Sequence, residues 1–267
     1  MRQNEVFPYY RKCCDELEKQ YAYIKSLYND QYVDELCAMR GYVDEHQRNL
    51  IKEMKLGYCQ IEDTENLGDM RRELGLVSKK DNFLLNERFI VPVHNVENRI
   101  VALIGYLNDT KKYITTPSPY FSKECMFFNF NQAYELSWRE YNGFVILVEG
   151  IFDCLSLRSI GLPCIATMGA SVSKFKCELL KLFKKVLAIP DDDDTGRKAL
   201  DRYSRTGWQV PYNTTFLKFL GGEVDFGTEK LHCKDMDNFV SWFEPDDVRE
   251  VLLSFYDSKE DIEVFRL

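Results

Sequence analysis

Six carboxylates stand just beyond apolar segments in the second half of this 267-residue chain: Glu149, Asp153, Asp191, Asp193, Asp235 and Asp237. They form three groups, which follow the apolar runs 144–148 and 186–189 and the candidate strand 215–220. Carboxylates gathered in one crevice repel each other, because unit charges about 4 Å apart cost about 4 kcal/mol at an effective dielectric constant of about 20. A divalent cation removes that cost. Ligands that are all oxygen favour Mg2+ or Mn2+ over zinc, so the pattern predicts a magnesium or manganese site.

The apolar runs that precede these carboxylates predict a parallel β-sheet. They show no alternation with polar residues, which is typical of strands buried on both faces. Segments of about ten residues with helical spacing separate them, as in an α/β domain. In an open parallel sheet the binding crevice lies beyond the carboxyl ends of the strands, where the acidic groups stand. The predicted strands are 144–148, 163–167, 186–189 and 215–220, and the predicted helices are 152–160, 173–185 and one from Arg197 towards Arg205.

Each acidic group also has a simpler interpretation when it is taken alone. A run of four aspartates such as 191–194 is usually a solvated turn, and Glu149 would serve as a helix cap, since carboxylates favour helix N-termini. The joint order is harder to obtain by chance: a strand, Glu-Gly, an aspartate, a second strand and then Asp-x-Asp. This order favours the metal crevice.

The first half of the chain has a different pattern. Residues up to about 60 carry aromatic, leucine and methionine side chains at helical spacing. From Arg88 the pattern changes to short β-type runs at 89–93 and 100–104. We therefore expect an α+β amino-terminal subdomain over residues 1–140, an α/β domain over 141–245 and a short carboxyl-terminal helix within 246–267.

Composition limits the class of protein. The chain is 45% hydrophobic and 29% charged, with a formal net charge of −8. No apolar run approaches the roughly 20 residues of a membrane helix, so a soluble, cytoplasmic protein without membrane contact is expected. The nine cysteines contain no Cys-x-x-Cys pair, which argues against a zinc site. The acidic balance alone would exclude nucleic acid as a partner.

The distribution of charge along the chain weakens this argument against nucleic acid. Residues 71–123 hold nine Lys and Arg against five acids, an excess of four positive charges. A basic strip beside an acidic crevice suits a polyanion, with Arg88, Lys112 and Lys123 as phosphate contacts. Tyr113 is either a stacking residue for a base or part of the core. Arg40 is either a further contact or the partner of a helix C-terminus.

Two motifs in the second half resemble the signature motifs of the TOPRIM fold. They are residues 147–153, which read LVEGIFD, and residues 191–196, which read DDDDTG. Upstream segments are similar, in order, to motifs of the catalytic core of DnaG-type bacterial primases. These segments are Met39-Arg-Gly41, Lys55-Leu-Gly-Tyr58, Arg88-Phe-Ile-Val-Pro-Val93, Lys112-Tyr113 and Lys123. The resemblance spans roughly residues 30 to 240.

The resemblance implies a nucleotidyltransferase with a TOPRIM domain. By the family pattern Asp191 and Asp193 are metal ligands, and the later acidic pair falls on Asp235 and Asp237. Glu149 would ligate a metal or accept the proton of the attacking hydroxyl. Asp153 is a further candidate ligand of the same cluster, while Asp192 and Asp194 are assigned either to solvent or to replacing a lost ligand. The implied activity is synthesis of short RNA primers on single-stranded DNA from nucleoside triphosphates with Mg2+ or Mn2+.

The chain also departs from the family. From the comparison with the family we expect the zinc-binding and helicase-binding domains to be absent, and the chain has Ile104-Gly-Tyr106 where the family usually has Gly-Gly-Arg. Lys234 stands where a glutamate is common. The leading prediction is a stand-alone primase core from a phage, plasmid or other mobile element. A replicative helicase or a single-strand-binding protein would assist it in trans.

Two other functions remain open from the sequence. A TOPRIM nuclease would use the same carboxylates on a water nucleophile. A non-catalytic replication module would only bind a helicase or another replication protein. A topoisomerase is disfavoured, because the residues left beyond a TOPRIM domain are too few for a strand-passage gate.

Overall fold

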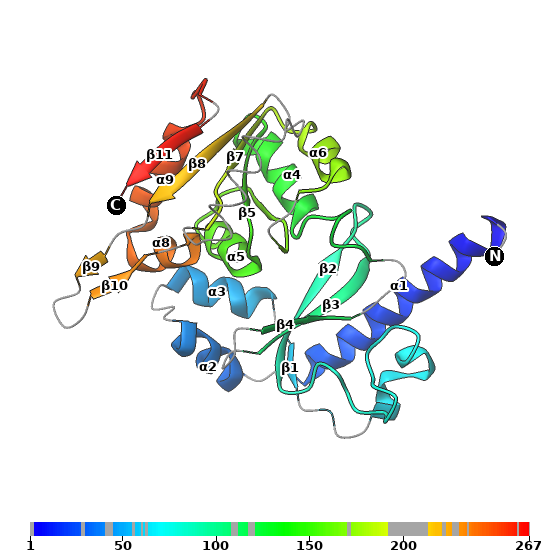
Figure 1. Cartoon of the computed structure of the whole chain (residues 1–267). Coiled ribbons are helices and arrows are strands. Elements are labelled where there is room, and N and C mark those ends of the chain that lie inside the picture. The colour runs from blue at the N-terminus through cyan, green and yellow to red at the C-terminus, as the bar shows by residue number, and fades with distance from the viewer. Residues whose placement is uncertain are drawn as a thin grey trace. The chain divides into compact units, whose positions relative to one another are not determined.

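A computed structural model gives the fold as two compact units, Met1–Ser122 and Lys123–Leu267 (Figure 1). The structure describes residues 3–27, 30–40, 45–54, 57–59, 61, 64–107, 112–116, 121–169, 172–191, 213–220, 223–225, 230–233, 235–260 and 262–266.

Unit 1 consists of helices followed by an antiparallel sheet. The helices are α1 (Gln3–Ser26), α2 (Asp30–Arg40) and α3 (Glu45–Met54). The sheet has the order β1-β2-β3-β4, with neighbouring strands antiparallel. Its strands are β1 (Gly57–Cys59), β2 (Arg88–His94), β3 (Ile100–Leu107) and β4 (Lys112–Thr115), and two short 3-10 turns lie between β1 and β2, η1 (Thr64–Leu67) and η2 (Asp69–Arg71). This confirms the predicted helices and small sheet.

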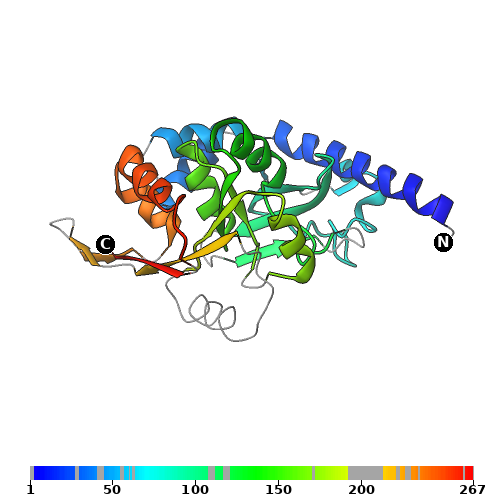
Figure 2. The same cartoon turned by 90° about the horizontal axis from the view of Figure 1, so that it is seen from above.

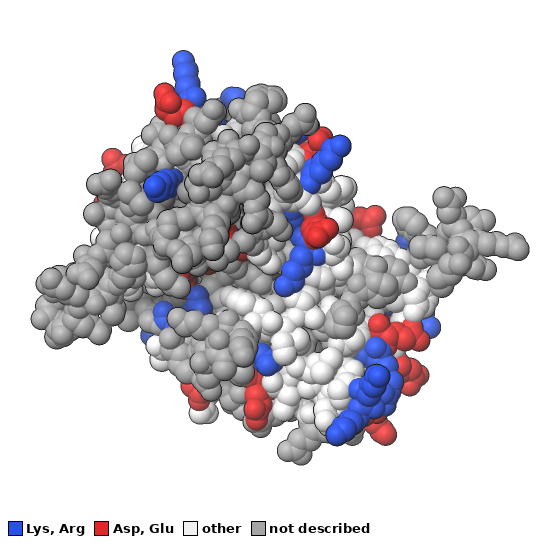
Figure 3. Space-filling model, in the orientation of Figure 1, with Lys and Arg blue, Asp and Glu red and all other residues white. Residues whose placement is uncertain are grey.

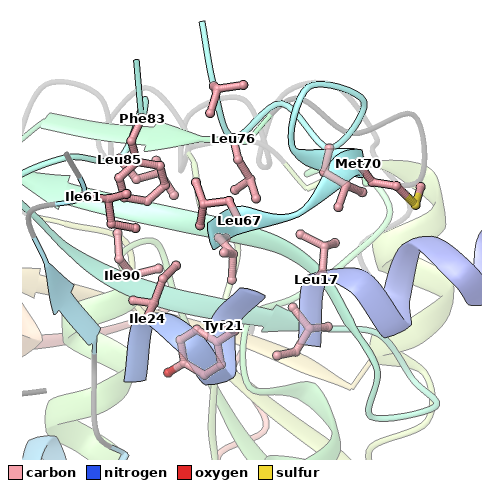
Figure 4. Packing of buried hydrophobic residues seen from close by; sticks show 14 of the residues in the cluster. Leu17, Tyr21, Ile24, Ile61, Leu67, Met70, Leu76, Phe83, Leu85 and Ile90 are labelled. Carbon is pink, nitrogen blue, oxygen red and sulfur yellow. The ribbon is translucent and has the colours of Figure 1, made fainter. Parts of the chain in front are cut away.

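The core of unit 1 forms between α1 and the sheet. Leu17, Tyr21 and Ile24 recur at helical spacing, so α1 presents one apolar stripe. Figure 4 shows these side chains beside Ile90 and Leu67 of the same cluster. Arg99, between β2 and β3, pairs with Asp15 and Glu18 and so ties the polar side of α1 to the sheet.

Unit 2 is built on a five-stranded parallel sheet of order β11-β8-β7-β5-β6. Figure 2 shows β11 lying alongside β8 at one edge. A separate antiparallel pair, β9 (Glu223–Asp225) and β10 (Lys230–His232), follows β8. The sheet strands are β5 (Phe144–Val148), β6 (Cys164–Ala166), β7 (Lys185–Ala188), β8 (Thr214–Leu220) and β11 (Ile262–Arg266). The helices are α4 (Phe130–Glu140), α5 (Ile151–Ser159), α6 (Lys174–Leu180), α8 (Met236–Trp242) and α9 (Pro245–Ser254).

Both faces of this sheet are covered. Ala133 of α4 and Leu180 of α6 belong to one core cluster with Leu147 and Val186 of the sheet, so these two helices cover the same face. All five residues of β5 are buried, so the opposite face is covered too. Helix α5 packs on β5 and β6 and also on α8. The predicted parallel sheet buried on both faces is confirmed.

Some predicted boundaries differ from the observed ones. The predicted helix 173–185 ends at Leu180, because residues 181–184 turn into β7. A strand, β11, follows α9, where the sequence predicted little more than a helix. The two compact units divide after Ser122, and α4 packs on β5 and β6 of unit 2, while the predicted domain boundary at residue 140 stays a prediction. The helix predicted from Arg197 lies outside the described residues. No helix in the described parts of the chain is both long and apolar enough to cross a membrane.

Gly143 makes the tight turn from α4 into β5 and gives a testable prediction. Its φ is +81°, and a Cβ atom there would lie 2.8 Å from Lys184 Cβ. Gly161 has φ of +82°, but a Cβ there would meet nothing closer than 3.9 Å. We expect Gly161→Ala to cost about 1 kcal/mol through backbone strain alone, and Gly143→Ala about 2–4 kcal/mol because overpacking is added. Urea denaturation of both variants measures this, and equal losses would contradict it.

Candidate active site

Glu149 and Asp191 leave the parallel sheet at the same edge. Glu149 follows β5 directly, and Asp191 follows β7 after two residues. The two strands are neighbours with Leu147 opposite Ala188, and the Ile189 amide donates to the Leu147 carbonyl (2.8 Å). Strand β5 has β6 on its other side, so the chain order reverses between β5 and β7. Ligands of open α/β sheets bind at such a switch point.

Asp153 folds back onto the start of its own helix. It lies in the first turn of α5, and only 7% of its surface is exposed. A Cβ atom at Gly150 would come within 2.2 Å of Asp153 Oδ2. Glycine is therefore required after Glu149, since any side chain would displace the Asp153 carboxylate.

The third acidic group is attached to the first through helix α8. Asp235 caps this helix, its Oδ1 accepting from the Asn238 amide at 2.9 Å. Asp153 Oδ1 accepts from the Asp237 amide at 2.9 Å, and Ser156 Oγ donates to Asp237 Oδ1 at 2.5 Å. Two carboxylates thus satisfy amide groups at the start of α8, which would otherwise lack helical partners. These bonds lock α5 to α8 and bring residues 84 positions apart into one cluster.

The electrostatics of this cluster fit a cation. The pKa of Asp153 lies well above its usual range, first because the carboxyl is buried and then because the charges of Asp235, Asp191 and Asp237 act on it. Nearby Cys233 is a buried thiol whose pKa is raised to about 12, chiefly by burial, so it stays protonated. The ligands on offer are therefore carboxylate oxygens, which suit Mg2+ or Mn2+.

The described residues hold only part of the predicted ligand set. Glu149, Asp153, Asp191, Asp235 and Asp237 are described, whereas Asp193 lies in the undescribed segment 192–212. Within the described parts no group of three His, Cys, Asp or Glu side chains is placed to hold a metal ion. Asp192 and Asp194, predicted to face solvent or to replace a lost ligand, also lie outside the described residues.

In unit 1, Arg40 and Tyr113 both contact Tyr106. Arg40 Nη1 donates to the Tyr106 hydroxyl at 3.0 Å, and its guanidinium lies 5.5 Å from the ring centroid. The Tyr113 ring is 5.0 Å from that of Tyr106. Tyr106 is 1% exposed and Tyr113 is 42% exposed. Tyr106 therefore orients Arg40 from within the fold, while Tyr113 presents its ring to solvent.

The remaining predicted cations are distributed over both units. Arg88 begins β2 and lies along Gly105, where a Cβ atom would meet its Cδ at 2.8 Å. Lys112 begins β4, and its side chain is not described. Lys123 is exposed and belongs to unit 2.

Three cations of the predicted basic strip form ion pairs with acids. Arg71 and Arg72 both pair with Asp81, and Arg99 pairs with residues of α1. Figure 3 shows basic and acidic side chains next to each other over the lower right of the molecule. Asp81 is one of the five acids already subtracted in the local charge balance, whereas the partners of Arg99 lie outside the strip, so the Arg99 pairs lower the local excess of positive charge further.

Two residues with a clear structural role were missed from the sequence. Ser156 stands three residues after Asp153, on the same side of α5, and this spacing was the available signal. Tyr106 was noted only as a replacement for an arginine. Its hydrogen bond with Arg40 forms because β3 and the end of α2 come together in the fold. No local pattern in the sequence indicates that contact.

Because the pKa of Asp153 is raised, we predict that the free energy of unfolding of the metal-free protein falls as this carboxyl ionises. Because its folded-state pKa lies above the ordinary value, its stabilising contribution is complete near pH 4 and is lost as pH rises through the folded pKa. Asp153→Asn keeps an oxygen for the Asp237 amide but cannot ionise. We expect it to be more stable than wild type at pH 7 by on the order of 1–3 kcal/mol, with the gap closing towards pH 4. Thermal melts in chelator across this range measure it.

Asp257→Asn provides the control, since this substitution removes the charge of an exposed carboxylate. A constant difference between wild type and Asp153→Asn from pH 4 to pH 8 would contradict the assignment. So would an equal gain in Asp257→Asn.

Comparisons with known proteins agree with this geometry. The family model described as Toprim-like matches residues 146–219, which include Glu149 and the aspartate run. The DNA primase of Thermotoga maritima is 31% identical over 194 residues, covering 66% of this chain and 33% of that protein. The chain thus spans about a third of the length of this curated relative.

Solved structures agree over a larger part of the chain. The Aquifex aeolicus primase, containing zinc-binding and RNA polymerase domains, has a TM-score of 0.65 and 25% identity, covering 90% of this chain and 61% of that one. A DnaG primase catalytic domain bound to single-stranded DNA has a TM-score of 0.63 and 18% identity, covering 88% and 79%. In its Toprim-like segment, its sequence relatives and its fold, the chain is similar to the catalytic cores of DnaG-type primases.

Proposed function

We propose that this chain synthesises short RNA primers on single-stranded DNA from nucleoside triphosphates, with Mg2+ or Mn2+. The observation that carries the proposal is the gathering of carboxylates around Asp153 at the switch point of the sheet. The similarity to DNA primases supports the choice of reaction. The relative bound to single-stranded DNA supports the choice of template.

Primer synthesis needs positioning and charge neutralisation more than covalent work by the protein. Glu149, Asp191 and Asp193 would act at the reacting atoms, as metal ligands or, for Glu149, as acceptor of the hydroxyl proton. The bound cation would supply charge neutralisation on the nucleotide phosphates. Asp235 and Asp237 complete the ligand set from the start of α8. Asp153, also predicted as a ligand, holds α8 in place through the Asp237 amide.

The first prediction from this proposal concerns Asp191 and Asp193. Asp191→Ala and Asp193→Ala should each lower primer synthesis by about 100-fold or more, because the charge developing on the phosphates is no longer neutralised. The measurement is the extension of labelled nucleotides on single-stranded DNA with Mn2+ or Mg2+. Asp257→Ala, which removes an exposed carboxylate elsewhere in unit 2, should keep wild-type activity.

The same assay separates primer synthesis from the alternatives. Degradation of labelled DNA or RNA without synthesis would mean a nuclease and would overturn the proposal. Unchanged biological effect of both alanine variants would mean a non-catalytic binding module. Full priming by the purified chain alone would contradict the further expectation of a helicase or single-strand-binding protein acting in trans. The origin from a mobile element stays a prediction.

A second prediction concerns the exposed ring in unit 1. We propose that Tyr113 stacks on a base while Arg40, Arg88, Lys112 and Lys123 contact phosphates or nucleotide. Base stacking on an aromatic ring contributes about 1–3 kcal/mol per base. Tyr113→Ala should therefore weaken single-stranded DNA binding about tenfold, and Tyr113→Phe should not. Fluorescence anisotropy with a labelled oligonucleotide measures both.

Tyr134→Ala is the matched control, because Tyr134 is similarly exposed but lies on α4 of unit 2. An equal loss in Tyr134→Ala would place the stacking site elsewhere. An equal loss in Tyr113→Phe would mean that the hydroxyl, and not the ring, makes the contact.

A further inference from the structure

Lys176 is a buried lysine that the proposed reaction does not use. It lies on α6, is 1% exposed, and neighbours the apolar core residues Cys177 and Leu180 of the same helix. Lysines are almost never fully buried unless they are paired. Burial lowers the pKa of Lys176 to about 8, so the fold disfavours its charge. An apolar side chain would fill this position at lower cost.

The ammonium of Lys176 points at the turn that follows β6. Its Nζ donates to the Thr167 carbonyl oxygen at 2.6 Å and lies 5.1 Å from the centroid of the buried Phe127 ring. The ring face attracts a cation, and a charged donor strengthens a hydrogen bond. At the start of α6, Ser173 accepts from the Lys176 amide at 3.2 Å and donates to the Glu124 carbonyl. Hydrogen bonds thus fix both the backbone amide and the side-chain ammonium of Lys176.

The turn that Lys176 holds is bonded to the backbone of Glu149. The Thr167 amide donates to the Val148 carbonyl at 2.9 Å, and the Met168 amide donates to the Glu149 carbonyl at 3.1 Å. Met168 has φ of +60°, a left-handed conformation that costs a side-chain-bearing residue free energy and persists only when surrounding contacts enforce it. Lys176 supplies such a contact one residue before the strained position.

We propose that Lys176 is a positioning residue for Glu149, holding the turn 167–169 in the conformation in which Met168 bonds the Glu149 backbone. The inference deepens the proposed function and rests on it for the role of Glu149. The lysine acts through Thr167 and Met168 and touches no reacting atom. Its charge is retained in the core because the turn requires a strong donor at the Thr167 carbonyl.

The test compares Lys176→Met with Lys174→Met, which removes an exposed lysine from the same helix. Hydrogen–deuterium exchange of the metal-free proteins reports on the turn. In Lys176→Met the amides of residues 166–169 should exchange about tenfold faster, while Lys174→Met matches wild type. The melting temperature of Lys176→Met should stay close to wild type, because methionine fills the site without a buried charge.

Primer synthesis gives the second readout. Lys176→Met should lower kcat about tenfold and raise the Mn2+ concentration for half-maximal activity, with KM for nucleotides unchanged. A purely structural role would lower the melting temperature and leave the metal requirement as in wild type. Unchanged exchange at the turn together with an unchanged metal requirement would overturn the proposal.

Two further arms keep the outcomes distinct. If wild type makes no primers, the proposed function fails, and the exchange experiment still decides whether Lys176 holds the turn. If Lys176→Met does not fold, Lys176→Leu replaces it under the same expectations. Restoration of wild-type exchange by Met168→Gly in the Lys176→Met background would support the assignment, since glycine adopts positive φ without strain. Failure of glycine to slow the exchange would count against it.

Discussion

The organisation of unit 2 depends on the burial of one carboxylate, Asp153, against the start of helix α8. A buried carboxylate is unfavourable, and other carboxylates around Asp153 increase that cost. The hydrogen bond from the Asp237 amide offsets part of it and leaves α8 with one amide satisfied by a residue of α5. The constraint therefore couples two helices distant in the sequence. Asp235 and Asp237 lie at the start of α8 and belong to no strand of the sheet. The same hydrogen bond therefore places this third acidic group near Asp153.

The other half of the acidic cluster is placed by strand register. Glu149 and Asp191 come from adjacent parallel strands, whose pairing is fixed by backbone hydrogen bonds and by apolar side chains on both faces. A shift by one residue would turn every side chain of β5 to the opposite face, and both faces are buried. The carboxylates at the strand ends are thus held by the same packing that forms the core.

The sequence predicts the strands and the acidic groups well, because both have local signals. Residues 144–148 are a continuous apolar run, and Glu149 ends it. Contacts between distant segments have no such signal. Ser156 bonds Asp237 and Lys176 bonds Thr167 only after the chain has folded. Strand β11 was missed because Ile262–Arg266 is short and mixes polar with apolar residues. Such a segment is recognised as a strand only once its pairing with β8 is known. Buried charge is also unexpected from composition, since Lys and Asp normally indicate surface.

Two buried ionisable groups of opposite sign, Asp153 and Lys176, lie in unit 2 and are each connected to the surroundings of Glu149. Burial raises the pKa of Asp153 and lowers the pKa of Lys176, so in both cases the fold resists the charged form. Asp153 lies four residues beyond Glu149 and binds α8, while Lys176 reaches the Glu149 backbone through the turn after β6. Neither charge improves stability over an apolar or neutral side chain of similar size. Each does fix the direction of a hydrogen bond that an apolar residue cannot make. Preorganised sites require such directional support, and stability lost in this way is the usual cost of a working site. We therefore attribute the two buried ionisable groups to the positioning of the acidic site that includes Glu149.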